Sequence, residues 1–441
     1  MISVGLIVPT WHYFNDPFKL QPLNELYFAT VLDEHYQGKV SVSVIDLRET
    51  RRNKPAISAD TIDDIIPEKD LYLHWIGKTA DFLEVESIIA ALRRVYPKAL
   101  HAAGGVHVHV FPEESKKTFD AIVLGPGEES FKQIIDDLSG CNNIQRQYNS
   151  DWSNVLYRNY PMPRRSFLPE ESIVNTELFK IYGGVRGSSA MMSRGCNFRC
   201  AYCVYNFPHA IQMRTPEQVR DEILYLKGEY KIDGLNLRDE ICIPLSPKVA
   251  IPYLEAIGST NVIWRGQTKV GAPKHLFELA RQTGCVELAI GAESASQRVL
   301  DIINKKQTVD QVRECISICK NLGIRIKMCL IIGLPGESPD ILDQTISFIE
   351  ETSPDFVNVS GFCPMPGSPI FEKKEEYGIK WISSDWSRHA HLMFRFSDEE
   401  HFGLPFEYES EGKWGKAFSN ERIIENIQHL QAYLRSRGMS Y

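Results

Sequence analysis

The sequence predicts an α/β protein in which a doubly wound parallel-sheet domain precedes a partial, TIM-like (β/α)6 barrel. Two long stretches of the chain alternate short apolar runs with helix-like patterns, which is typical of parallel strands covered by helices. A segment rich in proline and aromatic residues separates these stretches. Three closely spaced cysteines follow the first strand of the second stretch, and parallel barrels carry their chemistry at the carboxyl ends of their strands.

The first predicted domain covers residues 1–140. Its alternating pattern predicts a Rossmann-like domain, and the ligand of such a domain binds outside the carboxyl ends of the strands. The strands are expected at residues 3–8, 40–45, 71–76, 99–102 and 121–124, and the helices near residues 23–35, 82–96 and 129–138.

The alternation stops between residues 141 and 188. This segment contains "YRNYPMPRRSFLPEE", whose three prolines and clustered aromatic residues predict a linker or lid with little regular structure. Strand and helix alternate again over residues 189–370, which predicts the partial barrel. Its strands are expected at residues 190–193, 234–237, 262–265, 286–291, 325–332 and 356–362, and its helices include residues 216–227 and 309–322.

The remaining residues, 371–441, predict a small α-rich C-terminal region. This region closes on an amphipathic helix expected at residues 421–435, and as a whole it is expected to cap the barrel mouth. The segment before it is rich in tryptophan, histidine and charge, so it contains candidate substrate contacts, although such loops are as often ordinary packing. These candidates are Trp381, Trp386, His389 and His391.

The charge balance argues against a nucleic acid or an anionic membrane as the partner. The chain has 49 Lys and Arg against 57 Asp and Glu, dispersed along the sequence, for a net charge of −8. No apolar run approaches the roughly 18 residues of a membrane-spanning helix, and the opening "ISVGLIVPT" lacks the marks of a secretory signal. We therefore expect a cytoplasmic protein that acts on a small molecule.

The sharpest local signal is "RGCNFRCAYCVYN", which contains Cys196, Cys200 and Cys203. Ten cysteines are too few for a disulfide framework in a chain of 441 residues, so a tight group of three favours a metal site. Thiolates bind zinc and iron–sulfur clusters alike. A zinc site would take His209 as its fourth ligand, but the paired ligands of a structural zinc site are missing. Cys285, Cys315, Cys319 and Cys329 lie in helical or strand patterns that predict buried, inert thiols.

The spacing CxxxCxxC, with Gly195 before it and Tyr202 before the last cysteine, resembles the radical S-adenosylmethionine (SAM) superfamily. The resemblance implies that the three cysteines hold three irons of a [4Fe-4S] cluster and that SAM chelates the fourth iron. It also implies an external electron donor such as flavodoxin or ferredoxin. Cleavage of SAM would then give a 5′-deoxyadenosyl radical, which abstracts hydrogen from the substrate.

Three later segments, "GLNLRDE", "IGAESASQRVLDIINKKQT" and "IIGLPGES", resemble further motifs of the same family in order and spacing. Each residue also has an alternative explanation without a ligand. Asp239 and Glu240 would lie in a solvated turn, Glu293 would cap a helix, and Lys305 would be a surface lysine. The residues that the resemblance assigns to SAM are Tyr202, Asp239, Glu240, Glu293, Ser294, Lys305, Gly333, Leu334 and Pro335.

The first domain resembles the amino-terminal domain of the cobalamin-binding subgroup of this family. The likeness rests on "QPLNELYFATVL", "AAGGVHVHVFPEES" and "FDAIVLGPGEESF", with Asn24 and Pro126 as departures from the family pattern. "DEHYQG" fits another cobalamin motif but is expected to close a helix. His107 is equally well explained as an ordinary residue of an edge segment. The implied cobalamin contacts are Pro9, Thr10, Gly104, Gly105, His107, Gly125, Gly127 and Glu128.

These resemblances favour a cobalamin-dependent radical SAM enzyme that methylates an unactivated carbon of a small-molecule or natural-product intermediate. A domain without cobalamin would instead imply dehydration, epimerisation or rearrangement. A methylthiotransferase or nucleic-acid modifier is disfavoured because the charge is acidic and no second cysteine cluster is present. A zinc-stabilised, non-catalytic α/β binding protein is the alternative of another class. The sequence identifies neither a single catalytic side chain nor the substrate.

Overall fold

The structure is a computed structural model that describes residues 1–14, 16–49, 61–140, 142–204, 210–390 and 403–440. The chain forms two compact units, Met1–Ile173 and Val174–Tyr441. The boundary between them lies inside the segment predicted as a linker. The amino-terminal part of that segment contributes a strand to the first sheet, because Ile122 to Leu124 pair with Gln147 to Asn149.

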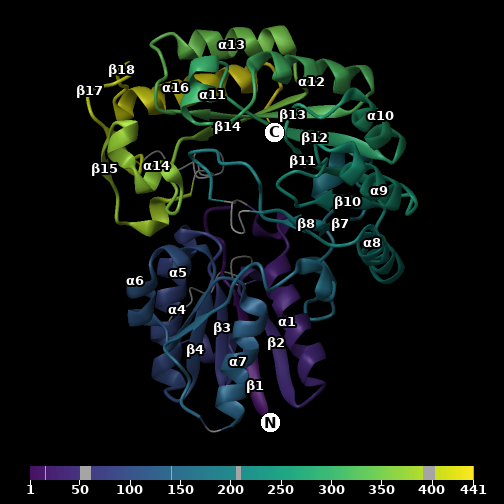
Figure 1. The fold of residues 1–441 in the computed structure, drawn as a ribbon, viewed down its shortest axis with the longest axis vertical. Coiled ribbons are helices and arrows are strands. Elements are labelled where there is room, and N and C mark those ends of the chain that lie inside the picture. The colour runs from purple at the N-terminus through teal and green to yellow at the C-terminus, as the bar shows by residue number, and fades with distance from the viewer. Residues whose placement is uncertain (15, 50–60, 141, 205–209, 391–402, 441) are drawn as a thin grey trace. The chain divides into compact units, whose positions relative to one another are not determined.

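The first unit is built on a parallel sheet of six strands in the order β2-β1-β3-β4-β5-β6 (Figure 1). The order reverses between β1 and β3, so the carboxyl ends of these two strands form the switch point of a doubly wound fold. The predicted fold class is therefore confirmed for this unit. The strands are β1 (Ile2–Val8), β2 (Val40–Asp46), β3 (Leu71–Trp75), β4 (Leu100–Gly104), β5 (Ala121–Leu124) and β6 (Gln147–Asn149).

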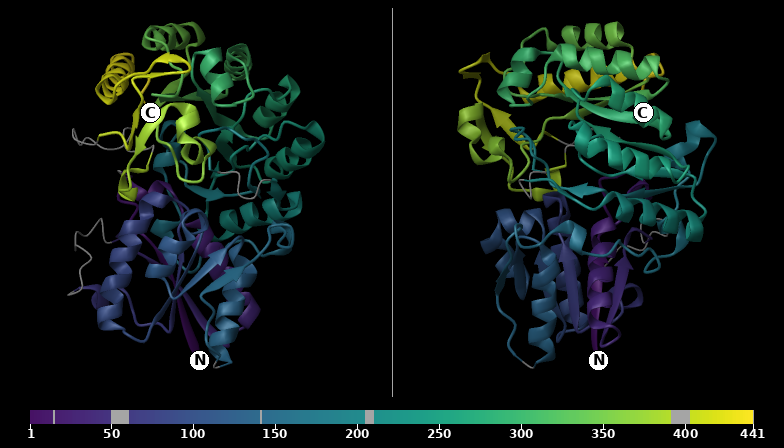
Figure 2. Two further views of the ribbon diagram at one scale, coloured as in Figure 1. Left: turned by 60° about the vertical axis from the view of Figure 1, so that its left-hand side comes forward. Right: turned by 45° about the vertical axis from the view of Figure 1, so that its right-hand side comes forward.

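Helices cover both faces of this sheet (Figure 2). Leu6 packs in one core and Ile7 in the other, because successive side chains of a strand point to opposite faces. The first core takes its helical residues from α1 and α7, and the second from α3 and α4. The helices are α1 (Leu23–Tyr36), α3 (Ile62–Ile65), α4 (Phe82–Val95), α5 (Val106–Val110), α6 (Pro112–Thr118) and α7 (Gly127–Ser139).

The segment "DEHYQG" ends helix α1, as expected. Gln37 is the left-handed C-cap of this helix, and Gly38 follows with φ 83°. It is therefore a helix terminus and does not follow the first strand, where the cobalamin motif of this form belongs.

Two histidines lie side by side inside the second core. His74 of β3 and His101 of β4 are 1% and 0% exposed, and Nε2 of His74 is 3.4 Å from Nδ1 of His101. The ring of His101 also stacks on Tyr72, with centroids 5.2 Å apart. Burial lowers the pKa of His74 well below its usual range and lowers that of His101 to about 4.

We expect this pair to make the first unit labile to acid. Below pH about 6.5 the two histidines take up protons in the unfolded chain but stay neutral in the folded chain. Stability therefore falls as the pH decreases toward 4. For His101 alone, the free energy of unfolding is about 2 kcal/mol lower at pH 5 than at neutral pH. Denaturant unfolding of His101→Phe, followed by circular dichroism, should depend less on pH than that of the wild type. Equal pH dependence in the two proteins would contradict this explanation.

The second unit is built on a parallel sheet of six strands in the order β14-β13-β12-β11-β10-β7. Its two edge strands, β7 and β14, do not pair with each other, so the sheet is an open, partial barrel, as predicted. The strands are β7 (Gly187–Ala190), β10 (Gly234–Leu237), β11 (Ile263–Thr268), β12 (Cys285–Glu293), β13 (Arg325–Ile332) and β14 (Phe356–Gly361).

The first barrel strand is displaced from its predicted position. The sequence predicts residues 190–193, whereas β7 spans Gly187–Ala190. Asp239 accepts hydrogen bonds from the backbone N–H groups of Met192 and Ser193, which diverts the chain from the sheet at this point. The strand itself is formed by small and polar residues, which is why its pattern was not recognised.

Helices cover the outer face of this sheet. Figure 1 shows α11, α12 and α13 on one side of β12 and β13. Thr308 caps α12 in a capping box with Gln311, which fixes where that helix begins. The main helices are α8 (Pro216–Tyr230), α9 (Pro247–Gly258), α10 (Lys274–Gln282), α11 (Gln297–Ile302), α12 (Val309–Asn321), α13 (Ile341–Thr352) and α16 (Asn420–Ser436).

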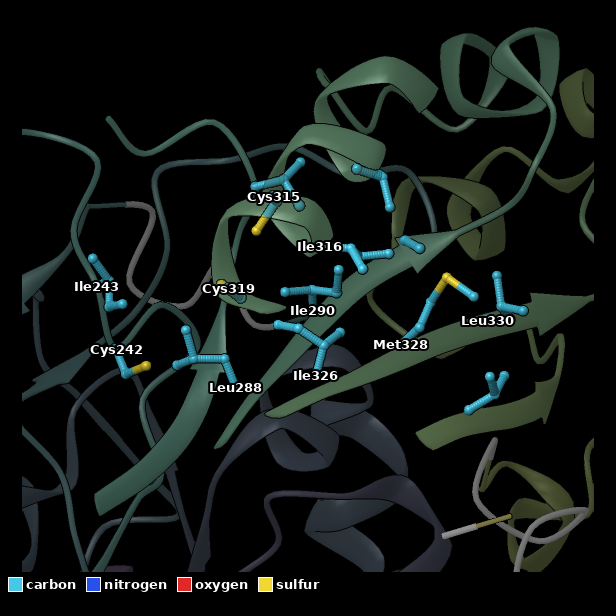
Figure 3. Packing of buried hydrophobic residues seen from close by; sticks show 14 of the residues in the cluster. Cys242, Ile243, Leu288, Ile290, Cys315, Ile316, Cys319, Ile326, Met328 and Leu330 are labelled. Carbon is cyan, nitrogen blue, oxygen red and sulfur yellow. The ribbon is translucent and has the colours of Figure 1, made fainter. Parts of the chain in front are cut away.

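The core of the second unit lies between these helices and the strands. Ile316 and Cys319 of α12 lie beside Ile290 and Ile326 of the sheet (Figure 3). Cys285, Cys315 and Cys319 are buried and free, as predicted, whereas Cys329 is half-buried. Burial raises the pKa of the Cys285 thiol, so it is protonated and inert.

The C-terminal region contains short strands as well as helices. Helix α16 packs beside α13 and against β14 and β13, where Ile423 and Ile427 join the barrel core. Among the described residues, no helix is both long and apolar enough to cross a bilayer. The smaller elements are α14 (Pro369–Glu372), β8 (Ser193–Arg194), β9 (Gln212–Met213), β15 (Ile379–Ile382), β16 (Phe406–Tyr408), β17 (Glu411–Gly412) and β18 (Gly415–Lys416).

Candidate functional site

The three clustered cysteines lie on a loop that follows β7 and the short strand β8. Gly195 opens the loop in a left-handed conformation with φ 78°, which favours glycine. Both oxygens of Asp239 accept the N–H of Met192 at 3.1 Å, and its Oδ1 also accepts the N–H and hydroxyl of Ser193. The structure thus places Asp239 where it holds the start of the cysteine loop.

The cysteine loop is fastened to the segment that carries Lys305. The N–H of Ala201 donates to the carbonyl of Ile303 at 2.8 Å, and the Asn304 amide donates to the carbonyl of Arg199 at 2.7 Å. Cys200 is buried, while Cys196 and Cys203 are partly exposed, and all three thiols are free of disulfides. Two parts of the chain about a hundred residues apart are therefore joined by hydrogen bonds.

Tyr202, Glu293 and Lys305 form a closed triangle beside the cysteines. Oε1 of Glu293 accepts from the Lys305 ammonium at 2.6 Å and from the Tyr202 hydroxyl at 2.8 Å. The Lys305 ammonium also donates to the Tyr202 oxygen at 3.0 Å. Burial raises the pKa of Tyr202 far above its usual range, so the phenol stays protonated and donates a hydrogen bond to Glu293. The sequence predicts each of these residues, and the structure brings them together.

The backbone around this triangle is strained. Glu293 ends β12 with φ 63°, and Asn304 and Lys306, on either side of Lys305, both have φ 52°. Non-glycine residues adopt such angles rarely, and the strain clusters at functional sites. Gly291 leaves room for the pair, because a methyl group there would lie 2.3 Å from Oε1 of Glu293 and 2.8 Å from the Lys305 nitrogen.

Glu240 is a half-buried carboxyl close to the cysteines. Burial raises its pKa to about 7, while Arg238 and Lys305 oppose the rise, and Glu240 in turn acts electrostatically on Cys196. Among the described residues no hydrogen-bond or ion-pair partner is found for this carboxyl. The positive charges of Arg238 and Lys305 thus act on Glu240, whereas Asp239 accepts backbone N–H groups.

The turn after β13 is held from both sides. The buried Glu337 carboxylate accepts the N–H groups of Gly333 and Leu334 at 3.0 and 3.1 Å, and the Tyr408 hydroxyl donates to the carbonyl of Gly333 at 2.8 Å. Burial raises the pKa of Glu337 to about 8. Gly333, Leu334 and Pro335 also line a cleft with the β17–β18 hairpin, whose wall includes Trp414.

Sequence reasoning missed two residues of this site, Lys269 and Gln307. Lys269 follows β11 and is 8% exposed, and its ammonium donates to the carbonyl of Lys305 at 2.6 Å and to Oε1 of Gln307 at 3.2 Å. Burial and Lys305 lower the pKa of Lys269 to about 8, and the thiols of Cys200 and Cys196 oppose the decrease. A search for the charged residue after each barrel strand would have found it.

The remaining predicted residues of this unit lie in less informative places. Ser294 is buried and accepts the N–H of Ser296. His389 is also fully buried, with Nε2 2.8 Å from the carbonyl oxygen of Ser383. Trp381 is exposed and Trp386 is half-buried, while His391, like the zinc candidate His209, lies outside the described residues.

In the first unit, the predicted glycines are explained by packing within the protein. A methyl group at Gly104 would meet the Trp75 ring at 2.8 Å, and one at Gly125 would meet a backbone oxygen at 2.0 Å. Gly105 and Gly127 are similarly enclosed, by the Ile76 backbone and by an aromatic ring of α1. These glycines are required by the fold, and their lack of a side chain is not itself a sign of a ligand.

Two other predicted cobalamin contacts are directed into the interior of the first unit. His107 is 0% exposed and stacks on Phe82 with centroids 4.0 Å apart, and burial lowers its pKa to about 3. It lies on helix α5 and not on an edge strand. Glu128 is also buried and accepts a hydrogen bond from the Tyr27 hydroxyl at 2.7 Å.

At the switch point between β1 and β3, Pro9 is buried, whereas Thr10 and Gly77 are half-buried. Pro9 and Thr10 follow β1, and the N–H of Thr10 donates to Glu84 at 2.8 Å. Gly77 follows β3, and among the described residues a methyl group there would meet only the Trp75 ring, at 4.0 Å. The neighbouring Lys78 lies over aromatic rings of the loop after β1, including that of Phe14 at 4.5 Å.

The donors of the cysteine loop are thiols, which bind iron–sulfur clusters and zinc alike. Within the described ranges, no group of three or more His, Cys, Asp or Glu side chains surrounds a point that one ion would occupy. Thiolates that hold a cluster bind different irons and need not converge on one point. Lys269 and Lys305 interact electrostatically with Cys200. Their positive charges would offset the negative charge of thiolates.

Residues 191–349 match the sequence profile of the Radical SAM superfamily. The chain is 28% identical over 317 residues to the anaerobic magnesium-protoporphyrin IX monomethyl ester cyclase of Cereibacter sphaeroides, with 67% of this chain and 52% of that protein covered. It is 26% identical over 368 residues to an uncharacterised methyltransferase of Pyrococcus horikoshii, with 80% and 78% covered. The chain thus spans about half the length of the cyclase.

A solved structure shares the fold of both units. It is the radical S-adenosylmethionine methyltransferase TsrM from Kitasatospora setae with cobalamin and a [4Fe-4S] cluster bound, at a TM-score of 0.68 and 15% sequence identity. The match covers 98% of this chain and 91% of that one. At this identity the likeness shows the fold: a Rossmann-like sheet followed by a partial barrel.

Proposed function

Because the chain belongs to the radical SAM superfamily, we propose that it is a cobalamin-dependent radical SAM enzyme that methylates an unactivated carbon of a small molecule. When bound, the iron–sulfur cluster supplies the electron that cleaves SAM, and cobalamin supplies the methyl group. An external reductant such as flavodoxin or ferredoxin provides that electron. The name of the Pyrococcus horikoshii relative supports the choice of methyl transfer.

One observation carries the proposal: the cysteine loop is fixed to the Tyr202–Glu293–Lys305 triangle. The hydrogen bond between Ala201 and Ile303 sets the distance between the thiols and a buried ammonium group. A cluster needs thiolates, and a chelating amino acid needs a cation for its carboxylate and an anion for its ammonium group. Cysteines, Lys305 and Glu240 provide these three kinds of group at one edge of the sheet.

The SAM contacts follow from the charges at this edge. Lys305 binds the methionine carboxylate, since it is the cation of the triangle and is buried beside the cysteines. Glu240 accepts the methionine ammonium group, because its carboxyl lies near Cys196 and among the described residues has no other partner. Asp239 acts behind it by holding the loop. The carbonyl edge of the turn at Gly333–Pro335 remains the proposed contact of adenine.

The first unit fits cobalamin best at its switch point. Gly77 is half-buried, and Trp11 is the partly exposed ring of the loop after β1, whereas Tyr13 and Phe14 are buried. We therefore assign the cobalamin contacts to Pro9, Thr10 and the segment around Gly77 in preference to His107 and Glu128.

The packing of the predicted glycines favours one alternative. If Gly104 and Gly125 serve the fold alone, the first unit need not hold cobalamin, and the same barrel would perform hydrogen abstraction without methyl transfer. The Cereibacter sphaeroides relative is named for a cyclisation and not for methyl transfer.

Metal and cofactor analysis of anaerobically purified protein separates these functions. We expect about four irons and about one cobalamin per chain, with iron matched by sulfide. Iron without cobalt would support the radical-only alternative. Zinc in place of iron would refute both and leave the non-catalytic zinc protein.

Gly291→Ala tests the triangle without changing any charge. Its new methyl group would overlap Glu293 Oε1 and the Lys305 ammonium, so the ends of both side chains must shift. We expect the affinity for SAM to fall about tenfold or more, a loss of about 1.4 kcal/mol, while iron content is retained. Gly228→Ala is the matched control, because nothing lies within 4 Å of its added methyl group. Isothermal titration calorimetry that gives equal affinity for both variants would contradict this prediction.

A further inference from the structure

Lys269 is a buried cation that lies outside the sequence motifs assigned to the cluster and SAM. It follows β11, and its ammonium donates to the carbonyl of Lys305 at 2.6 Å and to Oε1 of Gln307 at 3.2 Å. Burying an ammonium group is costly unless it is paired or hydrogen-bonded, and here both acceptors are neutral. Its position therefore calls for an explanation beyond packing.

The contacts of Lys269 reach both arms of the Glu293–Lys305 pair. One bond fixes the main chain of Lys305 itself. The other orients Gln307, whose Nε2 donates to the carbonyls of Gly291 and Ala292 at 2.9 and 3.4 Å. These carbonyls lie directly before Glu293, so one ammonium group sets the backbone on both sides of the pair.

Lys269 also faces the cysteine loop. Its nitrogen lies 4.6 Å from the centroid of the Phe198 ring, between Cys196 and Cys200 in the sequence, which is a cation–π distance. Its charge acts on the thiols of Cys200 and Cys196. A fixed positive charge beside a cluster stabilises the reduced, more negative state.

We propose that Lys269 is a positioning residue that fixes the Glu293–Lys305 pair for SAM and raises the reduction potential of the cluster. This inference rests on the proposed function, since it requires a cluster on the three cysteines. Lys269, at the end of β11, would thus support the site electrostatically.

Lys269→Met removes the charge and keeps the length of the side chain. In anaerobically reconstituted protein we expect unchanged iron content, SAM affinity about tenfold weaker, and reduction about tenfold less favourable. For a one-electron couple that is a midpoint about 59 mV lower in a redox titration followed by electron paramagnetic resonance. Lys269→Arg keeps the charge and should retain the wild-type potential. Lys274→Met, an exposed lysine on α10, should change neither quantity.

The outcomes distinguish the inference from the function on which it rests. A wild-type potential and affinity in Lys269→Met would overturn the inference and leave the proposed function intact. If Lys269→Met fails to hold a cluster, Lys269→Arg decides: a retained cluster at the wild-type potential supports the electrostatic role, and its loss there too overturns it in favour of a merely structural one. A wild-type protein without iron would remove the proposed function and the inference together.

Discussion

Replacing Cys200 with alanine is expected to lower the iron content from about four to less than one per chain and to abolish cleavage of SAM. Cys200 is the buried member of the three, and its loop is fixed by the bond from Ala201 to Ile303, so no neighbouring thiol can move into its place. The overall fold should persist, because the loop lies outside the strands of the sheet.

The matched control for this change is Cys329→Ala. Cys329 is a half-buried thiol on β13 that the proposed cluster does not use. Colorimetric iron assay and circular dichroism should show full iron content in this variant and native secondary structure in both. Retention of about four irons in Cys200→Ala would contradict the assignment of the cluster to these cysteines.

Replacing Lys305 with methionine is expected to weaken SAM binding about a hundredfold, which is about 2.7 kcal/mol. The change removes the cation proposed for the methionine carboxylate and leaves the buried Glu293 without its ion-pair partner. Breaking a buried pair in this way destabilises the folded state by about 3 kcal/mol. Lys306→Met is the matched control, because this exposed neighbour carries the same charge.

A second substitution separates binding from stability. In the Glu293→Gln, Lys305→Met double variant no unpaired charge is buried, so most of the lost stability should return while SAM binding stays weak. Thermal unfolding and calorimetry measure the two quantities. Recovery of SAM affinity in the double variant would show that Lys305 supports the fold and does not bind the cosubstrate.

The sequence predicted the architecture because both sheets are built from clear patterns. Strands such as Ala121–Leu124 and Arg325–Ile332 have the predicted bounds, since buried parallel strands form continuous apolar runs with sharp ends. The sequence does not predict strand β6, because this strand has only three residues, Gln147–Asn149, in a polar segment. Strand β7 was misplaced because its neighbours are more apolar than its own residues.

The cysteine site could be predicted from spacing, but the roles within it could not. Asp239 and Glu240 are equivalent in the sequence, and only the hydrogen bonds in the structure show that Asp239 holds the loop. Lys269 gives no motif because its role depends on contacts with Lys305 and Gln307, which lie almost forty residues away in the sequence.

The glycines of the first unit show that a strand-end glycine has more than one explanation. A glycine at a strand end permits a ligand to approach, but it equally permits a neighbouring side chain or backbone to do so. At Gly104 and Gly125 the space is taken by Trp75 and by the carbonyl of Ser150. Only the packed structure shows that an added methyl group at Gly77, in no recognised motif, would have more space than at these positions.

The most direct test of the proposed function is whether the protein cleaves SAM. Anaerobically reconstituted protein is incubated with SAM and dithionite, and 5′-deoxyadenosine and methionine are measured by liquid chromatography and mass spectrometry. We predict that the wild type forms both products in equal amounts and that Cys200→Ala forms neither. A wild-type protein that holds about four irons yet leaves SAM intact would contradict the account.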